Sequence, residues 1–151
     1  MKSNKKLLIV FLLVLNSIGI LHANYAFYRK VTTTCKSYRV DITSDNMQLN
    51  MDSNNFTINL TSRRNNFEMI MIIGFAAAGQ AIIHQKHLQG TINNYNPVIP
   101  AQVSVFVTVP MGRGDTIFSA EANAFLVQEL ADGSLDTAEF MIEIKDSIQT
   151  L

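Results

Sequence analysis

The chain has one cysteine, Cys35, among its 151 residues. A single thiol excludes an internal disulfide, so the apolar core must stabilise the fold. Outside the cytoplasm, such a thiol is either buried or paired with a cysteine of another chain. We prefer the buried, unreactive thiol and keep an intermolecular disulfide through Cys35 as the alternative.

The common catalytic motifs are missing as well. The sequence contains no Gly-x-Ser-x-Gly, no His-Glu-x-x-His, no phosphate-binding loop and no dinucleotide fingerprint. It also has no internal repeat and no low-complexity tract. We therefore expect a protein that needs no cofactor and carries out no catalysis.

Acidic residues are absent before Asp41, whereas the first six residues carry three lysines. A continuous apolar run at 7–15 follows, and Ala23 supplies a small residue at a plausible cleavage point. A basic start, a short apolar middle and a small-residue end form a secretory signal peptide. An uncleaved membrane anchor is the alternative, but this run is shorter than the about 20 residues that cross a bilayer. We predict a signal peptide at 1–23 and a periplasmic or secreted mature protein.

Charge is unevenly distributed along the chain. The whole sequence has 12 basic and 12 acidic residues, and loss of the leader's three lysines leaves a net charge of −3. Between Arg29 and Arg64 six basic residues face three acids, whereas residues 115–151 hold eight acids and one lysine. Such halves attract each other within one fold or between copies. We expect another protein or a second copy as partner, and no nucleic acid, because the mature chain is acidic and exported.

Three segments after residue 37 alternate apolar and polar side chains with a period of two. This period is typical of strands with one buried face, and the segments are separated by turn-forming Ser, Asp and Asn. We predict a three-stranded antiparallel meander with Ser53-Asn54 at the second tip. The apolar positions are Tyr38, Val40 and Ile42, then Met47, Leu49 and Met51, then Phe56, Ile58 and Leu60. In this register Met51 faces Phe56, Leu49 faces Ile58 and Met47 faces Leu60.

Residues 67–83 are the most apolar stretch of the mature chain. Asn65 and Glu68 have the spacing of a helix-start capping pair. A helix that is apolar all round is usually buried, so we predict a core helix here. Its small residues Gly74, Ala78 and Ala81 form a stripe where another backbone can approach. A strand at 67–73 followed by a shorter helix is the second interpretation, and a membrane-inserted helix at 67–83 is the third.

The second half predicts a hairpin followed by two helices. After a loop at 89–100, alternating residues at 102–109 and 117–124 flank a glycine-rich connection. A helix at 124–131 should end at Gly133, and a second should run from Ser134 or Asp136 to the terminus. Its predicted apolar stripe is Ala138, Met141, Ile144, Ile148 and Leu151. The expected fold is α+β: an antiparallel meander and a second hairpin packed with a central apolar helix and two C-terminal helices.

We expect one domain at 37–151, preceded by an N-terminal extension at 24–36. His84 and His87 are three residues apart and would share one helix face, as half of a zinc or copper site would require. Two polar residues near a helix end are the simpler interpretation. Cys35 with either histidine is the only nucleophile–base pairing that the chain offers. A metal-binding protein or enzyme that uses Cys35, His84 and His87 is therefore the alternative to a non-catalytic module.

Arg113-Gly114-Asp115 lies in the glycine-rich connection of the second hairpin. An integrin ligand presents this tripeptide at a hairpin tip, and an exported protein provides that context. The glycines and the aspartate also satisfy the turn itself, so cell adhesion is a minority hypothesis. The interpretation we prefer is a small exported binding or assembly module that acts through protein–protein contacts.

Overall fold

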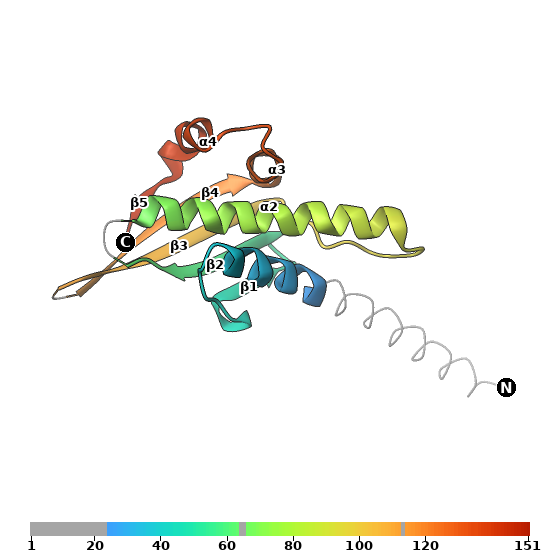
Figure 1. Cartoon of the computed structure of the whole chain (residues 1–151), viewed down its shortest axis with the longest axis horizontal. Helices are drawn as coiled ribbons and strands as arrows, with labels where there is room; N and C mark the ends of the chain where they lie inside the picture. Colours follow the sequence, from blue (N-terminus) through green and yellow to red (C-terminus); the bar gives the residue numbers. More distant parts are fainter. Residues whose placement is uncertain (1–23, 64–65, 113) are drawn as a thin grey trace.

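A computed structural model describes residues 24–63, 66–112 and 114–151 (Figure 1). The predicted signal peptide at 1–23, the capping residue Asn65 and Arg113 of the tripeptide lie outside the described residues. The predicted α+β class is confirmed: a five-stranded sheet packs with a central apolar helix and helices near the C-terminus.

The sheet has the strand order β1-β2-β3-β4-β5, which is also the order along the chain. The central pair β2 and β3 is parallel and the other three pairs are antiparallel. A parallel pair needs a long crossover connection, which the helix α2 provides here. The strands are β1 (Met47–Asn50), β2 (Asn55–Thr61), β3 (Gln102–Met111), β4 (Gly114–Asn123) and β5 (Gln149–Thr150).

The prediction of a first meander strand at 38–43 is wrong. Residues 38–43 form a turn and an irregular segment, and the short 3-10 helix η1 (Ser44–Asn46) leads into β1. Val40 and Ile42 are nevertheless buried, because this segment folds against the core. Alternating burial therefore produced a strand-like pattern without a strand.

The β1–β2 hairpin exists, but its register differs from the prediction by two residues. Met47 pairs with Ile58 and Leu49 with Phe56. The connection uses four residues, 51–54, with Asn54 in the left-handed region at φ 51°. A shift of two residues keeps every side chain on its own face, so the apolar pattern cannot distinguish the two registers.

Residues 24–37 are helical and include the whole segment 24–36 that the sequence marked as an N-terminal extension. Phe27, Val31 and Cys35 are completely buried in the same core as the sheet. The ring of Phe27 meets Phe56 of β2 edge to face, with centroids 4.9 Å apart. This N-terminal helix therefore covers the β1–β2 hairpin.

The predicted core helix is present as α2 (Phe67–Thr91), two turns longer than the apolar pattern indicated. Its helical start excludes the strand interpretation of 67–73, and Asn66 rather than Asn65 is its N-cap. The helix is long and apolar enough to cross a membrane, yet buried residues lie along most of its length, as in a core helix.

Glycines on α2 mark where its neighbours come closest. A Cβ at Gly79 would overlap the Val127 carbonyl and lie 2.6 Å from Ala131 Cβ, both on the next helix. A Cβ at Gly74 would lie 2.9 Å from side-chain atoms of Leu60 and Val105 in the sheet. The predicted small-residue stripe began at Gly74; the backbone approach occurs at Gly79.

The second hairpin and the first C-terminal helix are confirmed. β3 and β4 pair from Gln102–Asn123 to Met111–Gly114. Helix α3 (Ala124–Asp132) begins at an Asn123 cap, whose side chain accepts from the Leu126 N–H at 2.9 Å. It ends at Gly133, whose φ is 82°.

The last helix does not run to the terminus. α4 (Thr137–Ile144) starts at the predicted Asp136 cap and is followed by the 3-10 turn η2 (Lys145–Ser147) and then β5. Its buried residues are Phe140 and Ile144 rather than the full predicted stripe, and Ala138 is exposed. Phe140 packs edge to face on Phe75 of α2, at 5.1 Å between centroids.

The helices cover one face of the sheet (Figure 1). The opposite face carries polar side chains from three neighbouring strands. Asn55 donates to the Ser104 hydroxyl at 3.1 Å, and that hydroxyl donates to Glu121 at 3.1 Å. The molecule is therefore a two-layer structure with one polar sheet face.

Candidate binding site

A pocket of about 610 Å³ lies at the edge of β2, before the first residue of β1. We call it the strand-edge slot. Residues 39–42 and Asn46 line it from the segment before β1, and Asn66 and Ile70 line it from the start of α2. The remaining lining residues are Asn59, Leu60 and Thr61 of β2 and Arg63, which follows β2.

The slot exists because β1 is shorter than β2. Their pairing ends at Met47–Ile58. Just before β1, the chain turns through η1, where Asn46 N–H donates to the Thr43 carbonyl at 3.1 Å and Asn46 Oδ1 accepts from Thr43 N–H at 3.0 Å. These local bonds hold the chain out of the strand conformation. Residues 59–61 of β2 consequently have β3 on one side and the slot on the other.

The hydrogen bond of Ser62, the residue after β2, shows which backbone groups of β2 point toward β3. Ser62 N–H donates to the Thr108 carbonyl of β3 at 2.9 Å. Backbone groups of successive strand residues point to opposite edges. The N–H and C=O groups of Asn59 and Thr61 therefore point away from β3, toward the slot.

Arg39 reaches the slot from an unusual backbone position. The N-terminal helix ends in a Schellman motif: Val40 N–H donates to the Cys35 carbonyl at 3.0 Å, and Arg39 N–H donates to the Lys36 carbonyl at 2.9 Å. This motif requires a left-handed residue, and Arg39 has φ 61°. Glycine normally fills such a position, because a side chain there costs roughly 1–2 kcal/mol.

Arg39 and Arg63, two basic residues, line the slot together with one acidic residue, Asp41. All three residues are exposed. Within the described part of the chain, neither guanidinium is engaged in an ion pair or a hydrogen bond with the protein. Their donors are therefore available to a ligand from outside.

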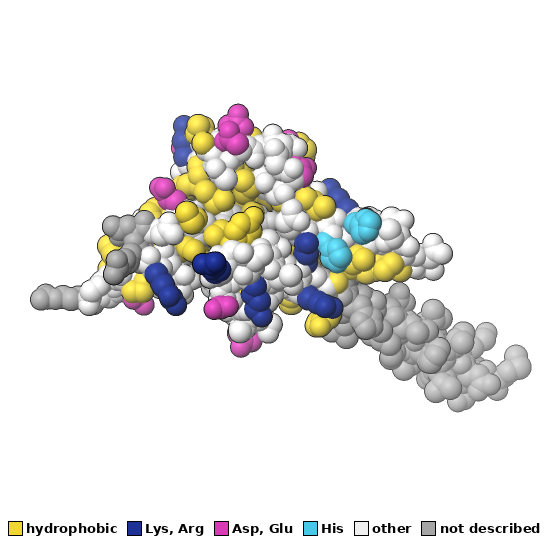
Figure 2. Space-filling view, viewed as in Figure 1, with side chains coloured by type: hydrophobic (Ala, Val, Ile, Leu, Met, Phe, Trp, Pro, Cys, Tyr) yellow, Lys and Arg dark blue, Asp and Glu magenta, His cyan; other side chains and the backbone are white. Residues whose placement is uncertain are grey.

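Charge is segregated in the folded molecule. Figure 2 shows most lysine and arginine side chains in the lower part of this face, with a few acidic side chains among them, and further acidic side chains over the α4 region beside one basic side chain. Among the residues that the structure describes, the basic and acidic halves of the chain are not joined by ion pairs. The uneven charge of the sequence thus persists in the fold as one side with an excess of basic residues and one side with an excess of acidic residues.

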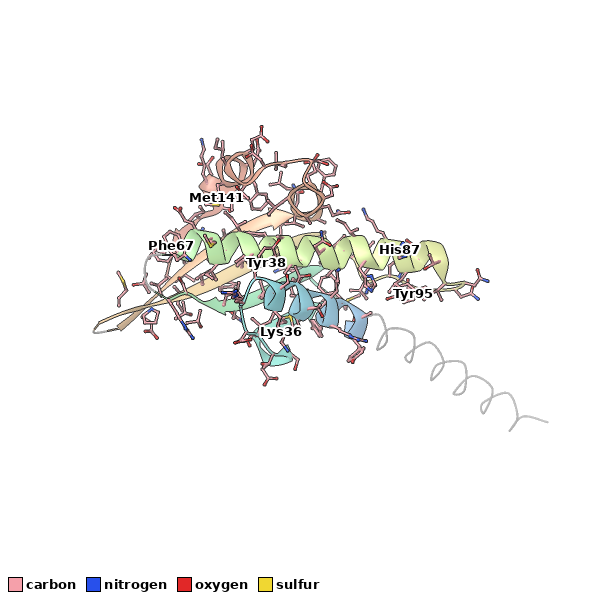
Figure 3. The ribbon with its side chains drawn as sticks, in the orientation of Figure 1. Lys36, Tyr38, Phe67, His87, Tyr95 and Met141 are labelled. Atoms are coloured by element: carbon pink, nitrogen blue, oxygen red, sulfur yellow. The ribbon has the colours of Figure 1, made fainter. Side chains whose placement is uncertain are left out.

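The two predicted metal ligands lie on the exposed side of α2. His84 is half-buried beside a second pocket, of about 390 Å³, that Tyr25, Arg29 and Lys30 also line. Burial lowers the pKa of His84, and the positive charges of Lys30 and His87 lower it further. His87 is exposed (Figure 3). Neighbouring cations oppose metal binding, and the described residues hold no group of three or more His, Cys, Asp or Glu that could bind a metal ion.

Cys35 is completely buried in the core. Burial raises the pKa of its thiol from 9.0 to about 11, so the thiol is neutral at physiological pH. A neutral thiol is a poor nucleophile. A disulfide to another chain would require the N-terminal helix to move away from the sheet first.

Gly114 and Asp115 of the predicted adhesive tripeptide lie near the tip of the β3–β4 hairpin, which projects beyond the helices (Figure 1). Gly112 has φ 43°, and exposed Asp115 pairs with Pro110. Arg113 lies outside the described residues, so adhesion through Arg113-Gly114-Asp115 stays a prediction.

No known protein family, characterised protein or solved structure matches this chain. The function therefore has to follow from the chain's own geometry. In that geometry the sequence patterns did not point to the slot residues Arg39, Asn59 and Arg63. The one available signal was the excess of basic residues between Arg29 and Arg64, which located the charge but not the pocket.

Proposed function

We propose that this protein is an exported, non-catalytic binding module that contacts an acidic protein surface through its basic side. The observation that carries the proposal is the charge segregation without ion pairs between the two halves in the described residues. Separated charge accelerates encounter with a complementary surface and orients the partner on arrival.

Two kinds of acidic surface meet this requirement. One belongs to a different protein, and the other is the α4 region of a second copy, where Asp136, Glu139 and Glu143 are exposed. Contact between the basic side of one copy and α4 of the next would be heterologous, and such contacts build rings or filaments. The same basic surface serves both cases.

The absence of a catalytic role is supported by the chemistry of the candidate nucleophile. Burial keeps Cys35 neutral, and the cations around His84 lower its pKa and disfavour a bound metal ion. Export is supported by the sequence of the first 23 residues alone.

The test measures salt-dependent association with matched charge variants. Crosslinking in the native compartment first identifies the neighbouring proteins. The mature chain is then sedimented alone and together with each of these proteins, not crosslinked, at about 0.05 M and about 0.5 M salt. We expect association that weakens at high salt and in the double variant Arg39→Gln with Arg63→Gln. The matched control, Lys86→Gln with Lys145→Gln, loses the same charge at exposed positions outside the N-terminal helix and the slot. It should associate nearly as the native chain does.

Three results would contradict the proposal. Association that ignores salt would remove its electrostatic basis. Equal loss in both double variants would show that net charge rather than the basic side matters. Retention of the full-length chain in the cytoplasm would exclude export.

A further inference from the structure

We infer that the strand-edge slot binds an extended peptide strand with an acidic side chain, which pairs with β2 beside Asn59 and Thr61. The inference deepens the proposed function and rests on it, because it assigns the partner a conformation and a place on the basic side. The occupant to which we commit is a segment of another protein.

The backbone of β2 supplies the pairing edge. Asn59 and Thr61 point their N–H and C=O groups into the slot, since Ser62 bonds to β3 on the other side. Strand addition to such an edge is a recurring mode of peptide recognition, in which main-chain hydrogen bonds provide affinity. A sheet edge with free donors and acceptors favours an extended chain over a compact ligand.

The side chains supply the preference for acid. Arg39 and Arg63 lie at the slot against one carboxylate, Asp41, so the lining is net positive. Arginine binds carboxylates through two parallel N–H donors. Asn59 adds an amide group that can bond to peptide backbone.

The walls limit the size of the occupant. Residues 39–42 line the slot together with β2, so an occupant that pairs with β2 also meets this segment. The volume of about 610 Å³ lies within the about 300–1,000 Å³ that is usual for ligand pockets. A single short segment matches these dimensions better than the edge of another sheet.

The backbone at Arg39 supports a role for its side chain. A non-glycine residue in the left-handed region is strained, and strain of this kind concentrates at functional sites. Glycine at this position would satisfy the Schellman motif more cheaply. The arginine therefore contributes something that the helix end itself does not need.

The first measurement is fluorescence anisotropy of a labelled hexapeptide, Thr-Glu-Val-Glu-Val-Thr, blocked at both ends. Its comparison peptides have Gln in place of Glu, or N-methyl groups at alternate residues on the edge that would pair with β2. We expect the Glu peptide to bind about tenfold tighter than the Gln peptide. N-methylation should abolish binding, and glutarate should compete only weakly.

The second measurement repeats the titration on variants. Arg39→Gly should weaken Glu-peptide binding about tenfold without loss of thermal stability. Asp41→Asn should strengthen it, because it removes the like charge. Arg29→Gln is the matched control and should bind as the native chain does.

Some outcomes overturn the inference and leave the proposed function intact. If N-methylation has no effect, or glutarate competes as well as the peptide, the slot is an anion site and not a strand site. If Arg39→Gly and Arg29→Gln weaken binding equally, the slot is not the place of contact. Salt-dependent association with protein partners would still stand in these cases; loss of that association as well would overturn both.

Discussion

The α2–α3 interface and the strand-edge slot meet backbone demands in opposite ways. At the interface, Gly79 stands where the backbone of α3 leaves no room for a side chain. At the end of α3, in open space, Gly133 takes the left-handed position. At the slot, the equivalent left-handed position at the end of a helix holds Arg39. One region uses the residue that packing requires; the other holds a residue that packing does not explain.

This difference separates structural from functional demand. The interface residues are determined by their neighbours, since a Cβ at Gly79 would meet Val127 and Ala131. Arg39 is exposed, strained and without a protein partner within the described residues. A residue that costs stability and gains no internal contact is best explained by an external one.

The largest effect is expected at the interface. Gly79→Ala forces its new methyl group into the Val127 carbonyl, so α2 and α3 must separate. Overpacking of this kind costs about 3 kcal/mol. Urea unfolding measures the loss. A change in the free energy of unfolding below about 0.5 kcal/mol would show that α2 and α3 can move apart at little cost. Packing would then not determine the residue at position 79.

The next effect concerns Cys35, which lies on the buried side of the helix that ends at Arg39. Its pKa is 9.0 when solvated and about 11 in the fold. Between these pH values the unfolded chain loses the thiol proton and the folded chain keeps it, so stability is full below pH 9 and falls as pH rises. The expected loss is roughly 2–3 kcal/mol by pH 11.

Unfolding curves of the native chain and of Cys35→Ala at several pH values isolate this contribution, because lysines and tyrosines titrate in both. The native chain should lose more stability than the variant above pH 9. If the stability of both proteins falls equally with pH, the thiol is solvated and the N-terminal helix does not exclude water from the core.

A smaller effect is expected at Gly133. Gly133→Ala places a Cβ at φ 82° and should cost about 1 kcal/mol, since open space surrounds the site and only the backbone is strained. Thermal unfolding measures it. An unchanged melting temperature would indicate that a non-glycine residue at a left-handed helix end costs little in this fold. The backbone of Arg39 would then not be strained.

The smallest effect has the opposite sign. Arg39→Gly should stabilise the protein by about 0.5–1 kcal/mol, because glycine relieves the left-handed strain. Urea unfolding beside Gly133→Ala provides the matched pair. Destabilisation by Arg39→Gly would show that the side chain supports the fold, and the two regions would then no longer differ in kind.

Much of the fold could be predicted from periodicity, because packing dictates it. The period of two at Val103 to Val109 identified β3, and the glycine at 133 identified the end of α3. Prediction failed where burial alternated without a strand, at Val40 and Ile42. It also failed at the C-terminus, where α4 stops after Ile144 and the chain returns to the sheet as β5. Local periodicity carries no information about pairing between strands that lie far apart in the sequence.

The slot could not be predicted, because it arises from a mismatch in strand length. β1 begins only at Met47, opposite Ile58, while β2 continues past Ile58 to Thr61, and the sequence of neither strand shows the length of the other. The positive φ of Arg39 is likewise invisible in a segment that reads as alternating strand. Only the basic excess around it was visible, and that pointed to a surface rather than to residues.

An NMR titration of the ¹⁵N-labelled chain with the Glu hexapeptide tests the central claim most directly. The slot account predicts that the amide signals of Asn59 and Thr61 shift and that their hydrogen exchange slows, while the signals of α3 stay unchanged. Shifts confined to α2 and α3, or spread evenly over basic side chains with no protection at Asn59 and Thr61, would contradict it.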